Sequence, residues 1–175
     1  MNWKYRSAYV LIKTAKGKAQ DVWKRFQGWD NMIGTWMVTG DHDVIAWFDA
    51  TDWDTVHRCV DTIKSWNDVE STSTHMVFNG MKNDHWWWEK PAGAWVFIRE
   101  NTLDETPKKI QHWPWVTSGA SVPGEWDYIS WVSGENWEDL WNHLSEMKQQ
   151  HWDANPVVPI KSWWNQKWKD QWWWE

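Results

Sequence analysis

The sequence of 175 residues predicts an α+β protein made of two copies of one unit, because three of its phrases occur twice. VTGDHDVIAWF at 38–48 returns as VPGEWDYISWV at 122–132, with Val, Gly, Asp, Ile and Trp shared. The other pairs are AYVLIK (8–13) with AWVFIR (94–99), and TDWDTVHRCVDTIK (51–64) with ENWEDLWNHLSEMK (135–148). Self-similarity at a fixed spacing indicates one supersecondary unit used repeatedly.

The first copy begins with a predicted strand at 8–13, where β-branched and aromatic residues follow one another. Residues 17–28 have apolar side chains at helical spacing and end at Gly28, which predicts a helix. Two strands are predicted at 33–38 and 44–48. The GDHD sequence between them is typical of a turn, so the pair is predicted to form a β-hairpin.

The second half of this copy predicts another helix and a final strand. Asp52 is expected to cap a helix whose apolar face consists of Trp53, Val56, Val60 and Ile63. Residues 69–78 predict the last strand, with alternating Thr and Ser on one face. The order β-α-β-β-α-β is that of the ferredoxin-like unit, with antiparallel strands and its helices on one face.

The second copy predicts the same order. A strand at 94–99 is followed by a short helix that starts at Thr106 and Pro107 and ends near Trp113. Strands are expected near 116–122 and 126–132. Asn136 is expected to cap a helix that presents Trp137, Leu140, Trp141, Leu144 and Met147 on one face.

The last strand of the second copy is expected near 155–161, where Pro156 and Pro159 favour the edge of a sheet. The chain is therefore predicted to contain a first unit at 1–79, a linker at 80–92, a second unit at 93–162 and a Trp-rich tail at 163–175. The aromatic stripe of the tail is expected to pack on the protein or on another subunit rather than on a membrane surface.

Composition excludes several classes of function. The net charge of −6 and pI of about 5.6 leave no basic footprint for nucleic acid. No apolar run is long enough to cross a membrane, and no signal peptide opens the chain. The single Cys59 excludes an internal disulfide and suits a cytoplasmic location. Twenty-four tryptophans occupy many positions that leucine normally takes, so part of this aromatic surface is expected at interfaces.

The hairpin phrase, followed by VESTSTHMVF at 69–78, resembles the ligand-binding half of the leucine-responsive regulator/asparagine C (Lrp/AsnC) transcription regulators, the RAM domain. The resemblance covers 8–78 well and 94–161 more loosely. It implies two tandem RAM/ACT-like units that form a pseudo-dimer within the chain, association into homo-oligomers, and a small amino-acid-like effector as partner. The family's helix-turn-helix has no room before residue 8, so no direct contact with nucleic acid is expected.

The resemblance and the residue chemistry together suggest where such an effector binds. Turn amides and carboxylates of the hairpin suit the two charges of an amino acid, and the Ser and Thr hydroxyls offer further hydrogen bonds. The candidate residues are Gly40, Asp41, His42, Asp43, Ser71, Thr72, Thr74, Gly124, Glu125 and Asp127. The plainer alternative is an ordinary turn and a half-exposed strand face. The second copy has Asn155 and Pro156 where the first has Ser71 and Thr72.

No motif for catalysis, metal binding or a cofactor is found. The seven histidines lack metal-ligand spacing, and Cys59 is expected to be a small buried hydrophobe rather than a nucleophile. The prediction is therefore a non-enzymatic sensing and oligomerisation module without a cofactor. Two alternatives remain: a structural protein that assembles through Trp-rich surfaces, and an enzyme of the dimeric α+β-barrel kind, such as a small monooxygenase or a haem protein.

Overall fold

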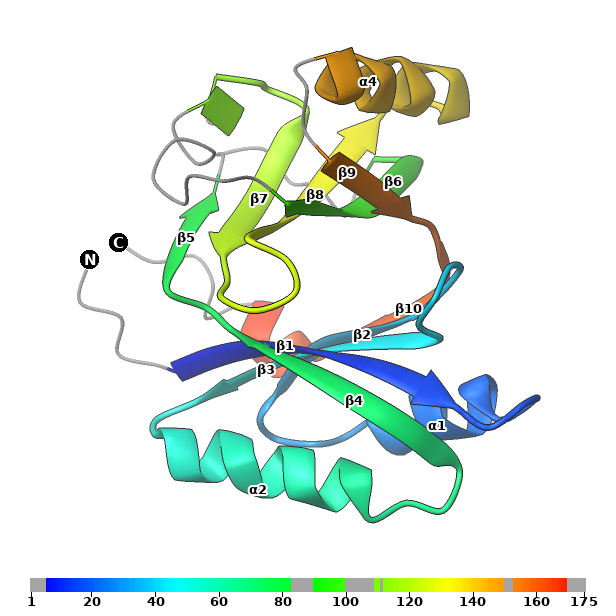
Figure 1. Ribbon diagram of the computed structural model, residues 1–175, viewed down its shortest axis with the longest axis vertical. Coiled ribbons are helices and arrows are strands. Elements are labelled where there is room, and N and C mark those ends of the chain that lie inside the picture. The colour runs from blue at the N-terminus through cyan, green and yellow to red at the C-terminus, as the bar shows by residue number, and fades with distance from the viewer. Residues whose placement is uncertain (1–5, 83–89, 100–108, 111, 150–152, 170–175) are drawn as a thin grey trace. The chain divides into compact units, whose positions relative to one another are not determined.

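The computed structural model describes residues 6–82, 90–99, 109–110, 112–149 and 153–169. The chain divides into two compact units, each built on one five-stranded antiparallel sheet (Figure 1). The first unit comprises 1–76 and 159–175, and the second comprises 77–158.

The first unit has the predicted order of elements. They are β1 (Arg6–Thr14), α1 (Ala19–Arg25), β2 (Met32–Val38), β3 (Val44–Ala50), α2 (Trp53–Lys64) and β4 (Val69–Met76). The prediction of a β-α-β-β-α-β unit is confirmed here. The strands lie in the order β10-β2-β3-β1-β4.

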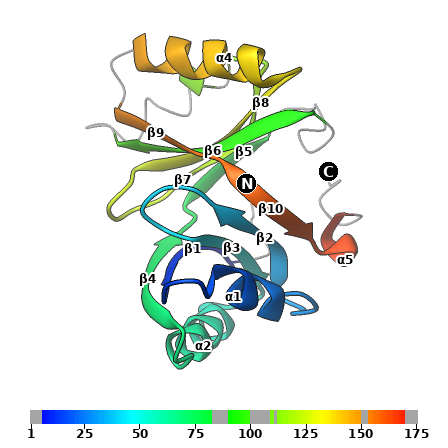
Figure 2. The ribbon, with the colours of Figure 1, turned by 90° about the vertical axis from the view of Figure 1, so that its right-hand side faces the viewer.

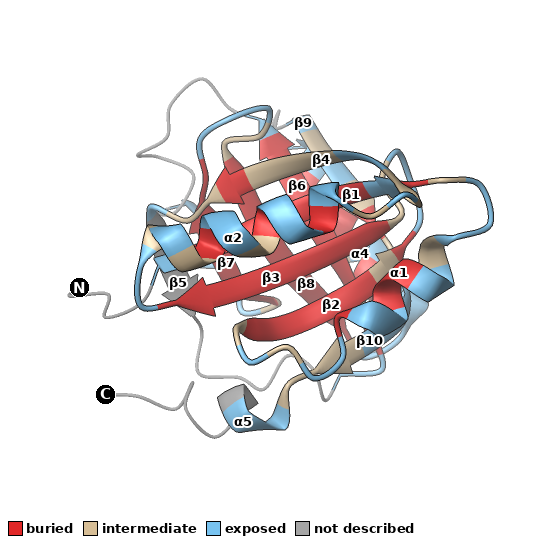
Figure 3. Cartoon of the chain, turned by 90° about the horizontal axis from the view of Figure 1, so that it is seen from below, coloured by how far each residue is buried: buried red, intermediate tan, exposed pale blue. Residues whose placement is uncertain are grey.

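Both helices of this unit cover the same face of the sheet (Figure 3). Val22 of α1, the following Phe26, and Val60 and Ile63 of α2 pack on the even-numbered residues of β1 and β3, such as Val10. The predicted cap of α2 is present, since the Asp52 Oδ1 accepts a hydrogen bond from the Thr55 backbone N–H at 2.7 Å.

The second unit repeats this arrangement. Its elements are β5 (Asn79–Lys82), β6 (Ala92–Arg99), β7 (Val116–Ser121), β8 (Tyr128–Gly134), α4 (Trp137–Gln149) and β9 (Asp153–Val157), and the strand order is β5-β7-β8-β6-β9. Of the short helix expected after Thr106, the structure describes only Lys109 and Ile110, both helical. Thr106 and Pro107 themselves lie outside the described residues.

The structure differs from the prediction at the ends of the second unit. The expected last strand is two strands: β9 is a sheet edge, as Pro156 predicted, whereas β10 (Pro159–Trp164) pairs with β2 of the first unit (Figure 2). The stretch expected to link the units begins with β5, which pairs with β7. Each sheet therefore takes a fifth strand from the segment that follows the last strand of the other repeat. Beyond β10, a short helix α5 spans Gln166–Lys169.

The apolar face predicted for α4 is wrong for two of its five residues. Leu140, Leu144 and Met147 are buried, but Trp137 and Trp141 are 49% and 51% exposed. At about 100° per residue, the two tryptophans fall on a stripe beside the buried one. The narrower stripe of Leu and Met is enough to cover the sheet. No helix in the described part of the chain is long and apolar enough to cross a membrane.

Candidate functional site

The predicted ligand residues of the GDHD sequence lie in the turn between β2 and β3. Gly40 has a φ of 106°, a conformation that glycine adopts without strain. The Asp43 Oδ2 accepts hydrogen bonds from the Thr14 backbone N–H at 2.8 Å and from the Thr14 hydroxyl at 3.1 Å. The Asp43 N–H donates to the Ile12 carbonyl. The Asp43 carboxylate therefore holds the hairpin against the end of β1.

Asp41 and His42 have no such structural role in the part of the chain that is described. The Asp41 side chain is exposed and that of His42 is half-buried. The described residues contain no group of three or more His, Cys, Asp or Glu side chains able to hold a metal ion. Asp41 is thus the hairpin carboxylate that faces solvent.

The hydroxyl residues of β4 are divided between the two faces of the sheet. Ser71 is paired with Lys13 and shares the face away from the helices. Thr72 and Thr74 are paired with Ile12 and Val10, whose side chains pack against the helices. Because successive side chains of a strand point to opposite faces of the sheet, Ser71 and Thr72 cannot lie on the same face. The expectation that Thr and Ser share one face is wrong.

The face of the first sheet that lies away from the helices carries a set of residues that the sequence reasoning missed. Tyr9 stacks on Trp47 at 5.1 Å between ring centroids, and Trp36 meets Trp164 edge-on at 4.8 Å. The pairing register places His75 beside Tyr9. Alternation at every second position of β1, β3 and β4 is the sequence signal that would have found this face.

Polar groups lie among these rings. The Trp47 Nε1–H donates to the Ser7 hydroxyl at 2.8 Å, and this hydroxyl donates to the Phe48 carbonyl. Asp49 is paired with Ser7 across the strands and is only 3% exposed. Burial raises the pKa of Asp49 to about 8, so its carboxyl group is mainly protonated at neutral pH. This face therefore combines flat apolar surface with a neutral carboxylic acid.

The second unit keeps the hairpin but not these polar groups. Gly124 has a φ of 136°, and the Asp127 N–H donates to the Ile98 carbonyl, as Asp43 does to Ile12. The Glu125 carbonyl accepts from the Arg99 Nε–H at 3.0 Å. By register, Ser133 stands in the place of Asp49, and Val157 in that of His75. Asp153 and Ala154, and not Asn155 and Pro156 as expected, therefore correspond to Ser71 and Thr72.

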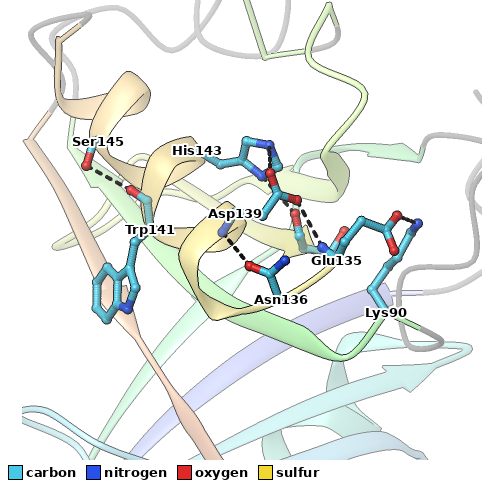
Figure 4. A network of polar contacts seen from close by, with 8 residues as sticks. Lys90, Glu135, Asn136, Asp139, Trp141, His143 and Ser145 are labelled. Carbon is cyan, nitrogen blue, oxygen red and sulfur yellow. Dashed lines mark hydrogen bonds and ion pairs between the residues drawn. The ribbon is translucent and has the colours of Figure 1, made fainter.

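A polar network at the start of α4 is structural (Figure 4). The Asn136 Oδ1 accepts from the Asp139 N–H, and the Asp139 Oδ2 accepts from the Glu135 N–H, both at 2.9 Å. The His143 Nε2 lies 3.3 Å from Asp139 Oδ1, and its Nδ1 lies 3.1 Å from the Ser133 carbonyl oxygen. Both ring nitrogens of His143 are thus engaged in fixing the helix, and Asn136 is confirmed as its cap.

Comparison with protein families identifies the first repeat. Residues 7–87 match the Lrp/AsnC ligand binding domain, a range that runs from β1 through β5. The resemblance drawn from the hairpin and last strand is therefore confirmed over the first repeat, which is similar to the Lrp/AsnC ligand binding domain. A comparison with curated protein sequences found no significant match.

Solved structures share the fold over most of the chain. The siroheme decarboxylase NirDL aligns with 90% of this chain and 72% of its own, at 10% identity and a TM-score of 0.66. An anthrone oxidase-like protein aligns with 93% of this chain and 94% of its own, at 8% identity and a TM-score of 0.54. A chlorite dismutase mutant from Candidatus Nitrospira defluvii aligns over 92% of both chains, at 8% identity and a TM-score of 0.53. These likenesses confirm the ferredoxin-like α+β fold.

Proposed function

We propose that this protein is a non-enzymatic sensing module that binds a small amino-acid-like effector at the GDHD hairpin. The observation that carries the proposal is the match of 7–87 to a ligand-binding domain, because the hairpin lies inside the matched range. The protein is further proposed to form homo-oligomers and to act without direct contact with nucleic acid, in keeping with its net charge of −6.

The proposal gives the hairpin residues separate roles, which their contacts support. Asp43 is engaged by Thr14 and keeps the turn in place. The exposed Asp41 carboxylate is then the group that pairs with the ammonium of an effector, while turn amides beside Gly40 receive its carboxylate. Ser71, exposed at the same end of the sheet as Thr14, supplies a further hydroxyl.

The remaining candidates are secondary in this proposal. Thr72 and Thr74 lie on the helix side of β4, so they support the strand rather than touch the ligand. Gly124, Glu125 and Asp127 form the corresponding hairpin of the second unit. The Arg99 Nη2 lies 4.0 Å from the Glu125 Oε1 there, so this carboxylate already has a positively charged neighbour and is less available to the ammonium of an effector.

Thermal unfolding by circular dichroism, with each of the twenty amino acids in turn, tests the proposal. A ligand that binds only the folded protein stabilises it by about 2.7 kcal/mol at 100 times its dissociation constant. We expect one or a few amino acids to raise the Tm, and Asp41→Asn to abolish the rise. Asp61→Asn, an exposed carboxylate on α2, is the matched control and should keep the response. The absence of any shift across the panel would refute the effector site.

A second candidate function is suggested by the aromatic face of the first sheet. Tyr9, Trp47 and Trp36 are buried aromatic rings of the kind that pack on a tetrapyrrole, and Asp49 and His75 lie on the same face of the sheet. The NirDL structure with an iron-uroporphyrin III analogue aligns with 90% of this chain at a TM-score of 0.65. Titration with iron tetrapyrroles, followed by the Soret absorbance, separates the two functions. A saturable spectral shift that is lost in His75→Ala would favour the enzyme class.

A further inference from the structure

A concavity of about 510 Å³ lies between the loop that joins β1 to α1 and the loop that joins α2 to β4. Its lining includes Lys18, Arg25, Trp66, Asn67 and Asp68, all in the first unit and none in the GDHD hairpin. The site and its chemistry are thus separate from the proposed effector site.

Arg25 is held in place but has unused hydrogen-bonding capacity. Its Nη1 donates to the Asp68 Oδ1 at 2.7 Å and its Nη2 donates to the Asp68 Oδ2 at 2.5 Å. The guanidinium lies 5.1 Å from the centre of the Trp66 ring. A guanidinium has five N–H groups, so the bond pair with Asp68 leaves three of them for another acceptor. Arg25 therefore acts as a fixed and still unsaturated donor.

Lys18 supplies a second positive charge at the same concavity. Its Nζ lies 3.7 Å from the Asp21 Oδ2, which is beyond hydrogen-bond distance, and its side chain is half exposed. Its charge also contributes to lowering the pKa of Asp68, after the larger effect of Arg25. With Asp21 and Asp68 ionised, the two cations and the two carboxylates balance, so a bound carboxylate would compete with Asp21 for Lys18 and with Asp68 for Arg25.

The backbone around the concavity is fixed before any ligand arrives. The Ala15 N–H donates to the Asp68 carbonyl at 2.8 Å, which joins the two loops directly. Trp66 packs on Phe26 and Trp29, with ring centroids at 5.2 and 5.6 Å. A ligand would therefore meet a preformed surface, and the cost of ordering loops on binding would be small.

From these contacts we propose that the concavity binds a small organic carboxylate. The free N–H groups of Arg25 and the Lys18 ammonium hold the carboxylate, and the Trp66 ring covers the apolar part of the ligand. Asp68 is a built-in competitor, because it occupies one edge of the guanidinium and repels an incoming anion. The affinity of the site is then set by Asp68.

Titration with lactate, against lactamide as an uncharged ligand of the same shape, tests the site at constant ionic strength. The side-chain N–H resonances of Arg25 and Trp66 in ¹⁵N NMR spectra report binding. We expect lactate to shift both resonances and lactamide to shift neither. Lys18→Gln should weaken lactate binding several-fold, and Asp68→Asn should strengthen it several-fold, because the competing carboxylate is removed.

The second unit offers a matched control. Arg99 lies 4.8 Å from the Trp126 ring centre, with the Asp153 carboxylate 3.8 Å from its Nη1, and the side chains of Arg99 and Asp153 are exposed in the second unit, outside the concavity. Asp153→Asn should leave lactate affinity unchanged. Equal shifts with lactate and lactamide would overturn the proposal, and so would an unchanged lactate affinity in Lys18→Gln. Lys18→Gln leaves the Arg25–Asp68 pair intact, so it tests the site even if Asp68→Asn fails to fold. Asp41→Asn should not affect lactate, so this site and the hairpin site fail or succeed separately.

Discussion

The Asp43 carboxylate accepts both the backbone N–H and the hydroxyl of Thr14, at 2.8 and 3.1 Å. These bonds join residues 29 positions apart and attach the β2–β3 turn to the end of β1. Two acidic residues of one turn thus have different roles: Asp43 is structural and Asp41 faces solvent.

Asp43→Ala is expected to destabilise the fold, because it leaves the partly buried Thr14 N–H without its acceptor. Hydrogen bonds to a charged group typically contribute about 1.5–3 kcal/mol. Asp41→Ala removes an exposed side chain and should change the free energy of unfolding by less than about 0.5 kcal/mol. Urea denaturation of both variants measures the difference. Equal losses would contradict the separation of roles.

The buried Asp49 predicts a stability that falls with rising pH. Its pKa is raised from 3.8 to about 8 in the folded protein by burial. Below the pKa that Asp49 has in the unfolded chain, its carboxyl group is protonated in both states, and its contribution to the free energy of unfolding is fully present. Between pH 4 and 8 the unfolded state releases the proton and the folded state keeps it, so stability falls by about 1.4 kcal/mol per pH unit.

Asp49→Asn keeps the shape and removes this titration. Relative to the unchanged protein, the variant should gain stability steadily from pH 4 to 8, reaching on the order of a few kcal/mol. Unfolding free energies measured in parallel across this range test the expectation, with Asp61→Asn as an exposed control. A constant difference between variant and parent would show that Asp49 ionises normally in the folded state.

The close approach of Trp131 to Gly93 leads to a third prediction, which concerns the stability of a Gly93→Ala variant. A Cβ built on Gly93 would overlap the Trp131 ring, which is buried and meets Trp95 edge-on at 5.2 Å. Gly93→Ala should therefore cost roughly 1–3 kcal/mol through overpacking. In the double variant with Trp131→Leu, the cost of the alanine should become smaller than in the parent. A double-mutant cycle measures this coupling, and strict additivity would exclude the steric explanation.

The two exposed tryptophans of α4 allow a test of assembly. Trp137 and Trp141 leave the buried face of the helix to Leu140, Leu144 and Met147. If oligomers form through such aromatic surface, Trp137→Gln/Trp141→Gln should lower the mass measured by light scattering without lowering the Tm. Leu144→Gln is the opposite control, because it should lower the Tm by disrupting the core. An unchanged mass would assign oligomer formation to another surface.

The sequence predicted those features that depend on local pattern. The duplicated phrases, the Asp52 and Asn136 caps and the Gly40 turn are each encoded within a few residues, and the structure confirms them. The destination of β10 was not predictable in this way, because pairing with β2 depends on contacts more than a hundred residues apart in sequence. The aromatic face was missed because tryptophan is so frequent in this sequence that its positions alone do not indicate which rings lie on the same side of the sheet.

The candidate site was also predictable only where it depends on local sequence. The resemblance located the hairpin correctly within the matched domain, but spacing alone did not separate Asp41 from Asp43. Thr72 and Thr74 were included with Ser71 although alternation places them on the other face. The concavity at Arg25 had no motif, since its residues come from the end of α1 and from two loops that meet only after folding.

The crossing of β5 and β10 to the opposite repeat bears on how the protein is made. Six of the first seven elements along the sequence, β1 to β4 with α1 and α2, belong to the first unit, yet the outer edge of β2 gains its partner only when residues 159–164 have been made. During synthesis this edge is open to other nascent chains until the last strand emerges. A truncation that ends before Pro159 would keep strands β1–β4 and β6–β9 and still leave the first sheet one strand short, because Pro159–Trp164 supply its fifth strand.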